Sequence, residues 1–175
     1  SFMSAFTELR PEDIRDNPFK LIGGDWMLIT AGDIKSFNTM TASWGGLGVL
    51  WDKNVAFCFV RPTRHTFGFM NNAETYSLSF FSEDYRSVLT YCGSHSGKHV
   101  NKAVHCGITP VAGSIDDVYF AEARLVLECR KSYFADSNPS AFLAQTLSDI
   151  YPEKDYHRMF IGEIVRVLGR ETMKS

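Results

Sequence analysis

The chain has 175 residues, 45% of them hydrophobic and 14% aromatic, which suits one globular domain with a substantial core. The 18 basic residues face 20 acidic ones, so the net charge is -2 and the basic excess of a general nucleic-acid binder is missing. No apolar run approaches the roughly 20 residues that a membrane-spanning helix needs. We therefore expect one domain over 1–175, in which Ser1 and Phe2, ahead of Met3, resemble a cloning remnant.

The first half of the chain predicts short antiparallel strands, because Val, Ile and Phe are enriched between closely spaced turn residues. Strands are predicted at 25–31, 38–44, 46–51, 54–60 and 75–81, with a tight turn at 52–54. Between the last two strands, Thr63 or Thr66 could cap a short helix that runs to about Asn72.

The second half adds helices to this pattern. Ser82 opens a predicted helix with Tyr85, Val88, Leu89 and Cys92 on its apolar face and Gly93 at its end. The remaining predictions are a loop at 93–97, helices at 98–105 (closed by Gly107) and 140–151, and strands at 121–134 and 158–169, with a bend or bulge at Gly162. Six or seven strands without regular βαβ alternation favour an antiparallel barrel, closed or partly closed.

Four cysteines are spread along the chain and form no C-x-x-C motif: Cys58, Cys92, Cys106 and Cys129. We find no leader-like segment ahead of them and expect reduced thiols in a cytoplasmic protein. Three histidines (His95, His99 and His105) lie near two of these cysteines in sequence, but their spacing matches no strong zinc pattern. We therefore predict no metal site.

The segment S-F-N-T-M-T-A-S-W-G-G at 36–46 is the strongest candidate for ligand binding. Small polar side chains let a flat ligand approach the backbone, whose N–H and C=O groups can meet the polar edge of a heterocycle. Strand alternation puts Thr39, Thr41 and Ser43 on one face, and Asn38, Met40, Ala42 and Trp44 on the other. The alternative is a half-exposed strand, because threonine is common on solvated sheet faces.

The segment R-P-T-R-H-T at 61–66 predicts a local anion site. Arg61 and Arg64 offer forked donors that match phosphate oxygens, at a predicted helix start whose free N–H groups favour an anion. The alternative is ordinary helix capping with surface arginines.

A third candidate is the loop G-S-H-S-G-K-H at 93–99, which resembles a phosphate loop but lacks the glycine spacing and the Ser or Thr of a Walker A motif. Lys98 could contact an anion there, or could be a solvated lysine in a loop. No G-x-S-x-G nucleophile elbow supports a hydrolase.

The order of these motifs resembles that of the flavin reductase-like family with the FMN-binding split-barrel fold, to which flavoredoxins belong. The resemblance covers about residues 17–169; its most specific part is N-T-M-T-A-S-W followed by R-P-T-R-H-T, and S-G-K-H-V-N-K, L-E-C-R and F-I-G-E-I-V follow in the expected order. It implies an all-β, six-stranded antiparallel Greek-key barrel with short helices, usually a homodimer with FMN near the subunit interface.

The resemblance also implies site residues. The segment Asn38–Trp44 (Asn38, Thr39, Met40, Thr41, Ala42, Ser43, Trp44) would line the ring and ribityl parts of non-covalently bound FMN. Arg61, Arg64 and Thr66 would approach the phosphate, Lys98 the ring or ribityl region, and His157 would close the site. The insertion at 136–152 is a place where family members differ, so the resemblance does not define access to the flavin.

The predicted function is an FMN-dependent oxidoreductase that takes a hydride from NADH or NADPH and passes electrons to a second flavin or another acceptor. No G-x-G-x-x-G fingerprint is present, so a nicotinamide would stack transiently over the flavin. No catalytic acid or base is nominated. The alternatives are a non-catalytic FMN electron carrier or redox sensor that serves a protein partner, and a barrel that has lost its flavin.

Overall fold

The computed structural model describes residues 4–143 and 147–170. Ten strands dominate: β1 (Thr7–Leu9), β2 (Met27–Asp33), β3 (Ser36–Ala42), β4 (Gly45–Leu50), β5 (Lys53–Val60), β6 (Thr75–Phe80), β7 (Pro110–Ala112), β8 (Val118–Phe120), β9 (Leu125–Asp136) and β10 (Arg158–Gly169). The α-helices are short: α1 (Thr66–Asn72), α2 (Arg86–Ser94), α3 (Lys102–Cys106) and α4 (Leu147–Ile150). No helix among the described residues is long and apolar enough to cross a membrane.

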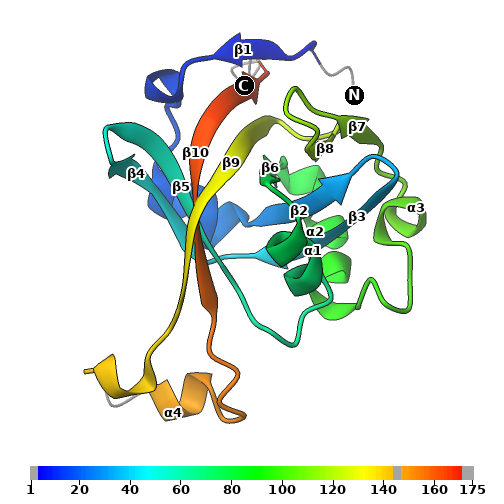
Figure 1. Ribbon diagram of the computed structural model, residues 1–175. Helices are drawn as coiled ribbons and strands as arrows, with labels where there is room; N and C mark the ends of the chain where they lie inside the picture. The colour runs from blue at the N-terminus through cyan, green and yellow to red at the C-terminus, as the bar shows by residue number, and fades with distance from the viewer. Residues whose placement is uncertain (1–3, 144–146, 171–175) are drawn as a thin grey trace.

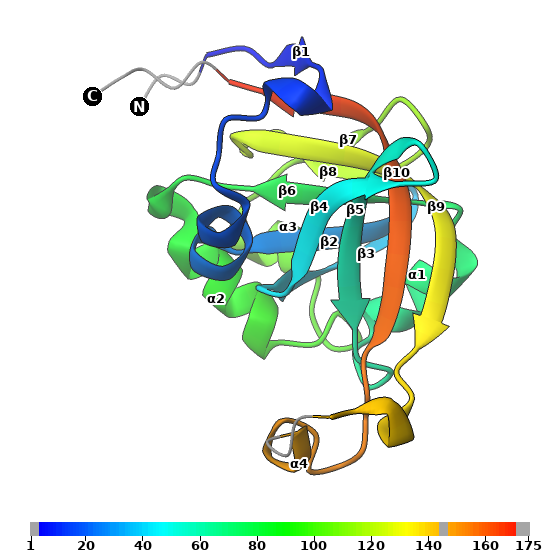
Figure 2. The same cartoon turned by 90° about the vertical axis from the view of Figure 1, so that its left-hand side faces the viewer.

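The main sheet is antiparallel and follows the order β3-β2-β6-β9-β10-β5-β4, with β1 added to β10. Its two end strands, β3 and β4, are consecutive in the chain and are joined only through Ser43 and Trp44. The sheet therefore curves into a barrel that is not closed by pairing between β3 and β4 (Figures 1 and 2). We call the gap between these two strands the seam. The predicted antiparallel split barrel is confirmed.

Two details of the strand prediction are wrong. The main sheet has eight strands instead of the implied six, and β7 and β8 form a separate two-stranded sheet. Strands β1, β7 and β8 have three residues each, too few to show an alternating pattern. The predicted strand at 121–134 begins only at Leu125, because Ala121, Ala123 and Arg124 form turn and loop hydrogen bonds instead of a ladder.

The long strands β9 and β10 lie in the middle of the sheet, and their ladder is irregular at Gly162, where the sequence predicts a bend or bulge. Their register shifts between Ile161 and Gly162, which marks a bulge. A Cβ at Gly162 would lie 2.5 Å from the hydroxyl oxygen of Tyr76, a fully buried ring that donates a hydrogen bond to the carbonyl of Ala56 at 3.1 Å. Glycine is therefore required here by close packing inside the barrel.

The helix predictions agree with the structure for most of α1 and α2 and only in part for α3. Helix α1 ends at Asn72 as predicted, but its N-cap is His65 and no side chain caps it. Helix α2 buries Leu89 and Cys92 as its pattern predicts, after a 3-10 turn over Glu83–Tyr85. Helix α3 spans 102–106, so it begins four residues later than the predicted helix at 98–105, and Gly107 is its C-cap.

The predicted helix at 140–151 is also wrong as a continuous element. Pro139–Ala141 forms a 3-10 turn, Phe142 is extended, and α4 begins at Leu147; residues 144–146 lie outside the described part of the chain. Pro139 occupies the first position of the 3-10 turn, and the rings of Phe142 and Tyr151 are in contact, with centroids 6.2 Å apart. The described residues of this segment therefore fold back on themselves below the barrel (Figure 1).

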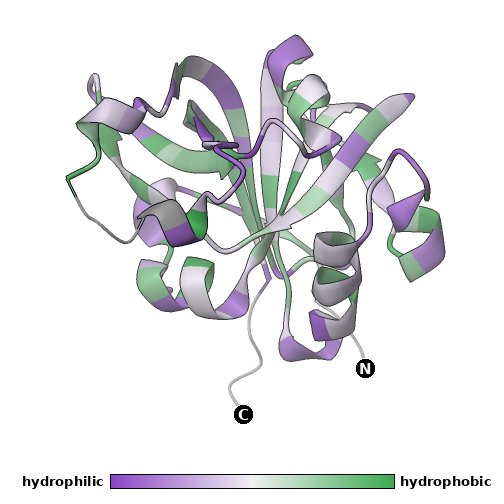
Figure 3. Cartoon of the chain, turned by 90° about the horizontal axis from the view of Figure 1, so that it is seen from below, coloured by the Kyte–Doolittle hydropathy of each residue, from purple (hydrophilic) through white to green (hydrophobic). Residues whose placement is uncertain are grey.

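The core has two parts. One fills the barrel and includes Met27, Tyr76, Leu78 and Phe160, all fully buried. The other lies between the sheet and helices α2 and α3. Figure 3 shows hydrophobic and hydrophilic segments alternating along the elements, as expected where each buries one face. Helices α2 and α3 therefore cover the sheet beside β3, the strand with the candidate ligand residues.

Candidate functional site at the barrel seam

Strand β3 has a free edge, because β2 pairs with only one of its sides. Lys102 of α3 reaches this edge: its Nζ donates to the carbonyl of Thr39 at 2.8 Å and to the carbonyl of Cys92 at 3.0 Å. The Thr41 hydroxyl donates to the carbonyl of Leu89 on α2. The two helices thus contact β3 at its middle, through Thr39, and near its C-terminal end, through Thr41.

The C-terminal part of β3 borders two adjoining hollows. One is a cavity of about 230 Å³ lined by Met40, Thr41, Ala42, Ser43, Trp44, Phe59, Arg61, Arg64 and His157. The other, of about 290 Å³, is lined by Trp26, Thr41, Ala42, Ser43, Leu89, Thr90 and Gly93. We call the two together the β3 groove. Small side chains form its floor and aromatic rings form its walls, which suits a flat ligand.

Two cations without acidic partners among the described residues lie near the groove: Arg64 lines its first hollow, and Lys102 lines a neighbouring hollow of about 300 Å³ with Asn38 and Thr39. The Arg64 guanidinium donates to the carbonyls of Gly93 and Cys92, at 3.2 and 3.4 Å, and Lys102 shares the Cys92 carbonyl. Burial lowers the pKa of Arg64, and burial together with the charge of Arg64 lowers the pKa of Lys102 to about 8. An anion in the groove would relieve both effects.

A third cation, Arg61, also lines the first hollow, and its charge is neutralised by a carboxylate. Arg61 forms an ion pair with Asp155 at 3.1 Å, donates to the carbonyl of Ile150, and lies over the ring of Tyr151 at 5.0 Å. The hydrogen bond from Arg61 is the largest cause of the lowered pKa of Asp155. Arg61 therefore lines the groove and also connects the segment 150–155 to the barrel, so it offers less net charge to a ligand than Arg64.

His157 forms the end wall of the groove. Its ring lies 5.0 Å from that of Trp44 and 6.4 Å from that of Phe59, and its Nδ1 is 2.6 Å from the Tyr151 hydroxyl. Burial and the nearby charge of Arg61 lower the pKa of His157 to about 4. The imidazole is therefore neutral near pH 7 and can offer hydrogen bonding but no positive charge.

Eight of the predicted site residues line the first hollow: Met40, Thr41, Ala42, Ser43, Trp44, Arg61, Arg64 and His157. Three others are buried nearby. Asn38 donates to the hydroxyl of Thr66 at 2.7 Å, and the Thr39 hydroxyl hydrogen-bonds Thr30 and the carbonyl of Ile29. Lys98 is exposed in a turn and lines none of the hollows described here.

The sequence analysis missed Lys102, although the motif S-G-K-H-V-N-K contains both lysines. The signal was Asn101, whose side chain accepts from the backbone N–H of Val104 and so starts α3 at Lys102. The predicted alternation of faces is wrong beyond Ala42, because β3 ends there and Thr41, Ala42 and Ser43 all line the groove.

The sequence profile of the domain described as "Flavin reductase like domain" matches residues 20–175. The chain belongs to the flavin reductase-like family. The resemblance that the motifs predict is therefore confirmed.

Solved structures show the same fold. Flavoredoxin from Methanosarcina acetivorans superposes with a TM-score of 0.68 at 20% identity, over 86% of this chain and 71% of that one. An FMN-binding protein from Thermus thermophilus, with bound 1-cyclohex-2-enone, gives 0.68 at 20% identity over 97% and 80%. An NADH:FAD oxidoreductase, SgcE6, from Streptomyces globisporus C-1027 gives 0.64 at 16% identity over 84% and 78%. No functionally curated protein matches the sequence.

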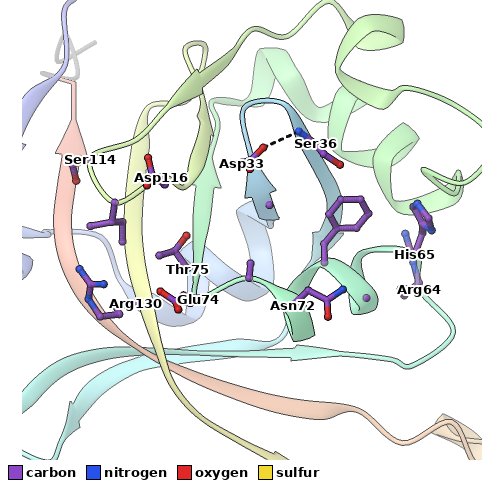
Figure 4. A pocket seen from close by; sticks show the side chains of 15 residues that line it. Asp33, Ser36, Arg64, His65, Asn72, Glu74, Thr75, Ser114, Asp116 and Arg130 are labelled. Atoms are coloured by element: carbon purple, nitrogen blue, oxygen red, sulfur yellow. Dashed lines mark hydrogen bonds between the residues drawn. The ribbon is translucent and has the colours of Figure 1, made fainter.

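This flavin reductase-like chain has a larger hollow, of about 990 Å³, beyond α1. Figure 4 shows Arg64 and His65 at one end of it and Arg130, Glu74 and Thr75 at the other. Carboxylates of Asp33, Glu74 and Asp116 also line it, and they would repel a phosphate. The larger hollow is therefore a poorer anion site than the β3 groove.

No group of three or more metal-ligating side chains occurs within residues 4–143 and 147–170. All four cysteines are free thiols.

Proposed function

We propose that this chain binds FMN without a covalent bond in the β3 groove and acts as an oxidoreductase that accepts a hydride from NADH or NADPH. The observation that carries the proposal is the cation pair, Arg64 and Lys102, beside an open strand edge in a chain of net charge -2. Neither cation has an acidic partner in the described part of the chain. Both lose solvation without gaining a carboxylate, and a bound anion would compensate them.

The residues present fit the parts of FMN. The phosphate carries about two negative charges near neutral pH, which suits Arg64, with Arg61 and Thr66 nearby. The small residues Thr41, Ala42 and Ser43 leave space for the ring, and Trp44 and His157 wall it. Lys102 replaces Lys98 as the proposed contact to the ring or ribityl region, because only Lys102 reaches β3.

FMN would supply the hydride and electron chemistry once bound. The chain's own task is to bind it, to exclude water from one face and to leave the other open. We nominate no catalytic acid or base. The groove is open at Trp44, which is 47% exposed, so a nicotinamide could stack there without a dinucleotide-binding domain. The NADH:FAD oxidoreductase of the same fold supports a nicotinamide donor.

We also propose a homodimer. Several large side chains on the outside of the sheet are exposed: Val49, Trp51, Tyr133 and Phe134. Trp51 and Tyr133 lie 5.9 Å apart edge to face across the β4–β5 hairpin and β9. Aromatic surfaces of this kind are typical of subunit interfaces. Cytoplasmic localisation stays a prediction from the cysteine pattern.

The first test is an absorption spectrum of the protein purified in air, followed by a titration with FMN. We expect a yellow protein, or quenching of FMN fluorescence on addition. A colourless protein that leaves added FMN unchanged would refute the proposal.

The second test separates an enzyme from a carrier. Bound flavin is reduced anaerobically with NADH and NADPH in parallel, and turnover with free FMN is then measured. Rapid reduction and turnover support the oxidoreductase. A flavin that dithionite reduces but neither nicotinamide does would support the electron carrier, the role that the likeness to flavoredoxin also favours.

A further inference from the structure

Two cysteines from different helices face each other beside the groove. On α2, Tyr91 and Cys92 are consecutive, and on α3 so are His105 and Cys106. The rings of Tyr91 and His105 stack in parallel, with centroids 4.1 Å apart and planes 7° apart. The next residue along each helix is the cysteine, and each of the thiols of Cys92 and Cys106 shifts the pKa of the other.

Lys102 fixes the same register from the other side. It lies one turn before Cys106 on α3, and its Nζ donates to the carbonyl of Cys92 at 3.0 Å. Residues four apart share a helix face, so Lys102 and Cys106 both face Cys92. The ring stack and the lysine contact together place Cys92 and Cys106 on the facing sides of α2 and α3.

The two thiols differ in access. Cys92 is fully buried, whereas Cys106 is partly exposed, so a reagent in solution can reach Cys106 first. Cys58 and Cys129 are fully buried inside the barrel. Burial raises the pKa of Cys92 to about 12 and also raises that of Cys106, while the charge of Lys102 acts in the opposite direction on both. Thiolate attack is therefore slow near pH 7.

We propose that Cys92 and Cys106 form a redox-active dithiol, which a small-molecule disulfide oxidises to a disulfide bond between α2 and α3. This site is additional to the flavin site and does not depend on the proposed function.

The exchange takes place in two balanced steps. The Cys106 sulfur, as thiolate, attacks one sulfur of glutathione disulfide; a mixed disulfide forms, the glutathione S–S bond breaks, and one glutathione leaves and takes up the Cys106 proton. The Cys92 sulfur then attacks the Cys106 sulfur, the protein disulfide forms, and the second glutathione leaves with the Cys92 proton. The dithiol loses two electrons and one glutathione disulfide becomes two glutathione molecules.

Tryptic mapping is a clean test, because trypsin places the four cysteines in four different peptides: 54–64, 87–98, 103–124 and 125–130. The reduced protein is equilibrated for hours in glutathione redox buffers at pH 8, and free thiols are then alkylated. We expect peptides 87–98 and 103–124 to become linked as the buffer is made more oxidising. Peptides 54–64 and 125–130 should stay alkylated, as an internal control.

Cys106→Ser, a substitution at a partly exposed position, should abolish the link and leave Cys92 as a free thiol. Cys92→Ala is the second variant, and circular dichroism confirms that each one folds. The proposal is overturned if Cys106 stops at the mixed disulfide with glutathione, if no thiol oxidises at any ratio, or if the link joins other cysteines or two molecules. None of these readouts needs flavin, so failure here and failure of FMN binding are distinguishable.

Discussion

Replacing Lys102 by glutamine tests the site most directly, because the structure supplies the expected magnitude. The side chain is only 3% exposed, and its Nζ contacts two carbonyls and no carboxylate among the described residues. Burial and the charge of Arg64 lower its pKa from 10.5 to about 8. That difference corresponds to about 3 kcal/mol against the charged form.

A phosphate bound beside Arg64 and Lys102 would recover at most this free energy. Loss of the charge in Lys102→Gln should therefore weaken FMN binding by up to about 100-fold. The pH dependence has a definite sign. Lys102 is charged below its pKa and neutral above it, so the affinity of the wild-type protein should fall as the pH rises through about 8. The variant should show no such fall.

The assay is quenching of FMN fluorescence from pH 7 to pH 9.5, a range in which the phosphate stays fully ionised. The matched control is Lys53→Gln, which removes one surface charge that pairs with Glu163 at 3.7 Å, and it should bind FMN like the wild type. Lys98→Gln removes the charge of the other lysine in the same motif, and it should weaken FMN binding by less than about tenfold. Equal affinities for wild type and Lys102→Gln, or a wild-type affinity independent of pH, would refute the reasoning.

Two further predictions concern stability. Gly162→Ala should lower the free energy of unfolding by about 1–3 kcal/mol, because the new Cβ would lie 2.5 Å from the Tyr76 hydroxyl. The control is Gly68→Ala in α1, where the new Cβ has no atom within 4 Å, and it should raise the free energy of unfolding by about 0.5–1 kcal/mol. Equal urea midpoints for the two variants would contradict this prediction. Burial, followed by a hydrogen bond with Glu128, raises the pKa of Asp117 to about 8. The folded state thus keeps a proton that the unfolded chain releases, so this group makes stability fall as the pH rises from about 4 to about 8. Asp117→Asn, a permanent donor, should flatten the melting temperature between pH 5 and pH 9; an unchanged pH slope would count against this assignment.

The sequence predicted the fold well where a pattern is long. Strand β10 was predicted with its observed bounds, and β6 differs by one residue. Both have enough residues for alternation to show and both pair over most of their length. The three-residue strands β1, β7 and β8 depend on partners far away in sequence, which no local pattern reveals. The β4–β5 turn was predicted at 52–54 but lies at Trp51 and Asp52, both with positive φ, because the ladder pairs Leu50 with Lys53.

The candidate site was predicted in its strand and less well in its charges. Residues of the N-T-M-T-A-S-W motif line the groove. The motif could be recognised from sequence because its small polar residues are visible in the composition. The state of each cation is set by tertiary contacts instead. Arg61 is neutralised by Asp155, 94 positions away, whereas Lys102 is buried beside Arg64. Sequence analysis named Lys98 because it lies at a predicted loop-to-helix junction and matches the family resemblance, but the exposure or burial of each lysine is decided by how α3 packs on α2.

The seam explains why ligand residues gather at this place in the barrel. An open sheet has two free edges whose backbone groups need partners. Here the edges belong to consecutive strands, and the chain crosses between them at Ser43 and Trp44, outside any ladder. Gly45 permits the crossing, because its φ is 156° and a Cβ there would lie 2.5 Å from the carbonyl oxygen of Phe57. Lys102 of α3 donates to the β3 carbonyl of Thr39, and Arg64 lines the first hollow beside the end of β3, so the free strand edge and two cations without acidic partners among the described residues lie close together. A planar anion with a polar edge satisfies both, whereas a closed barrel of the same composition would offer neither.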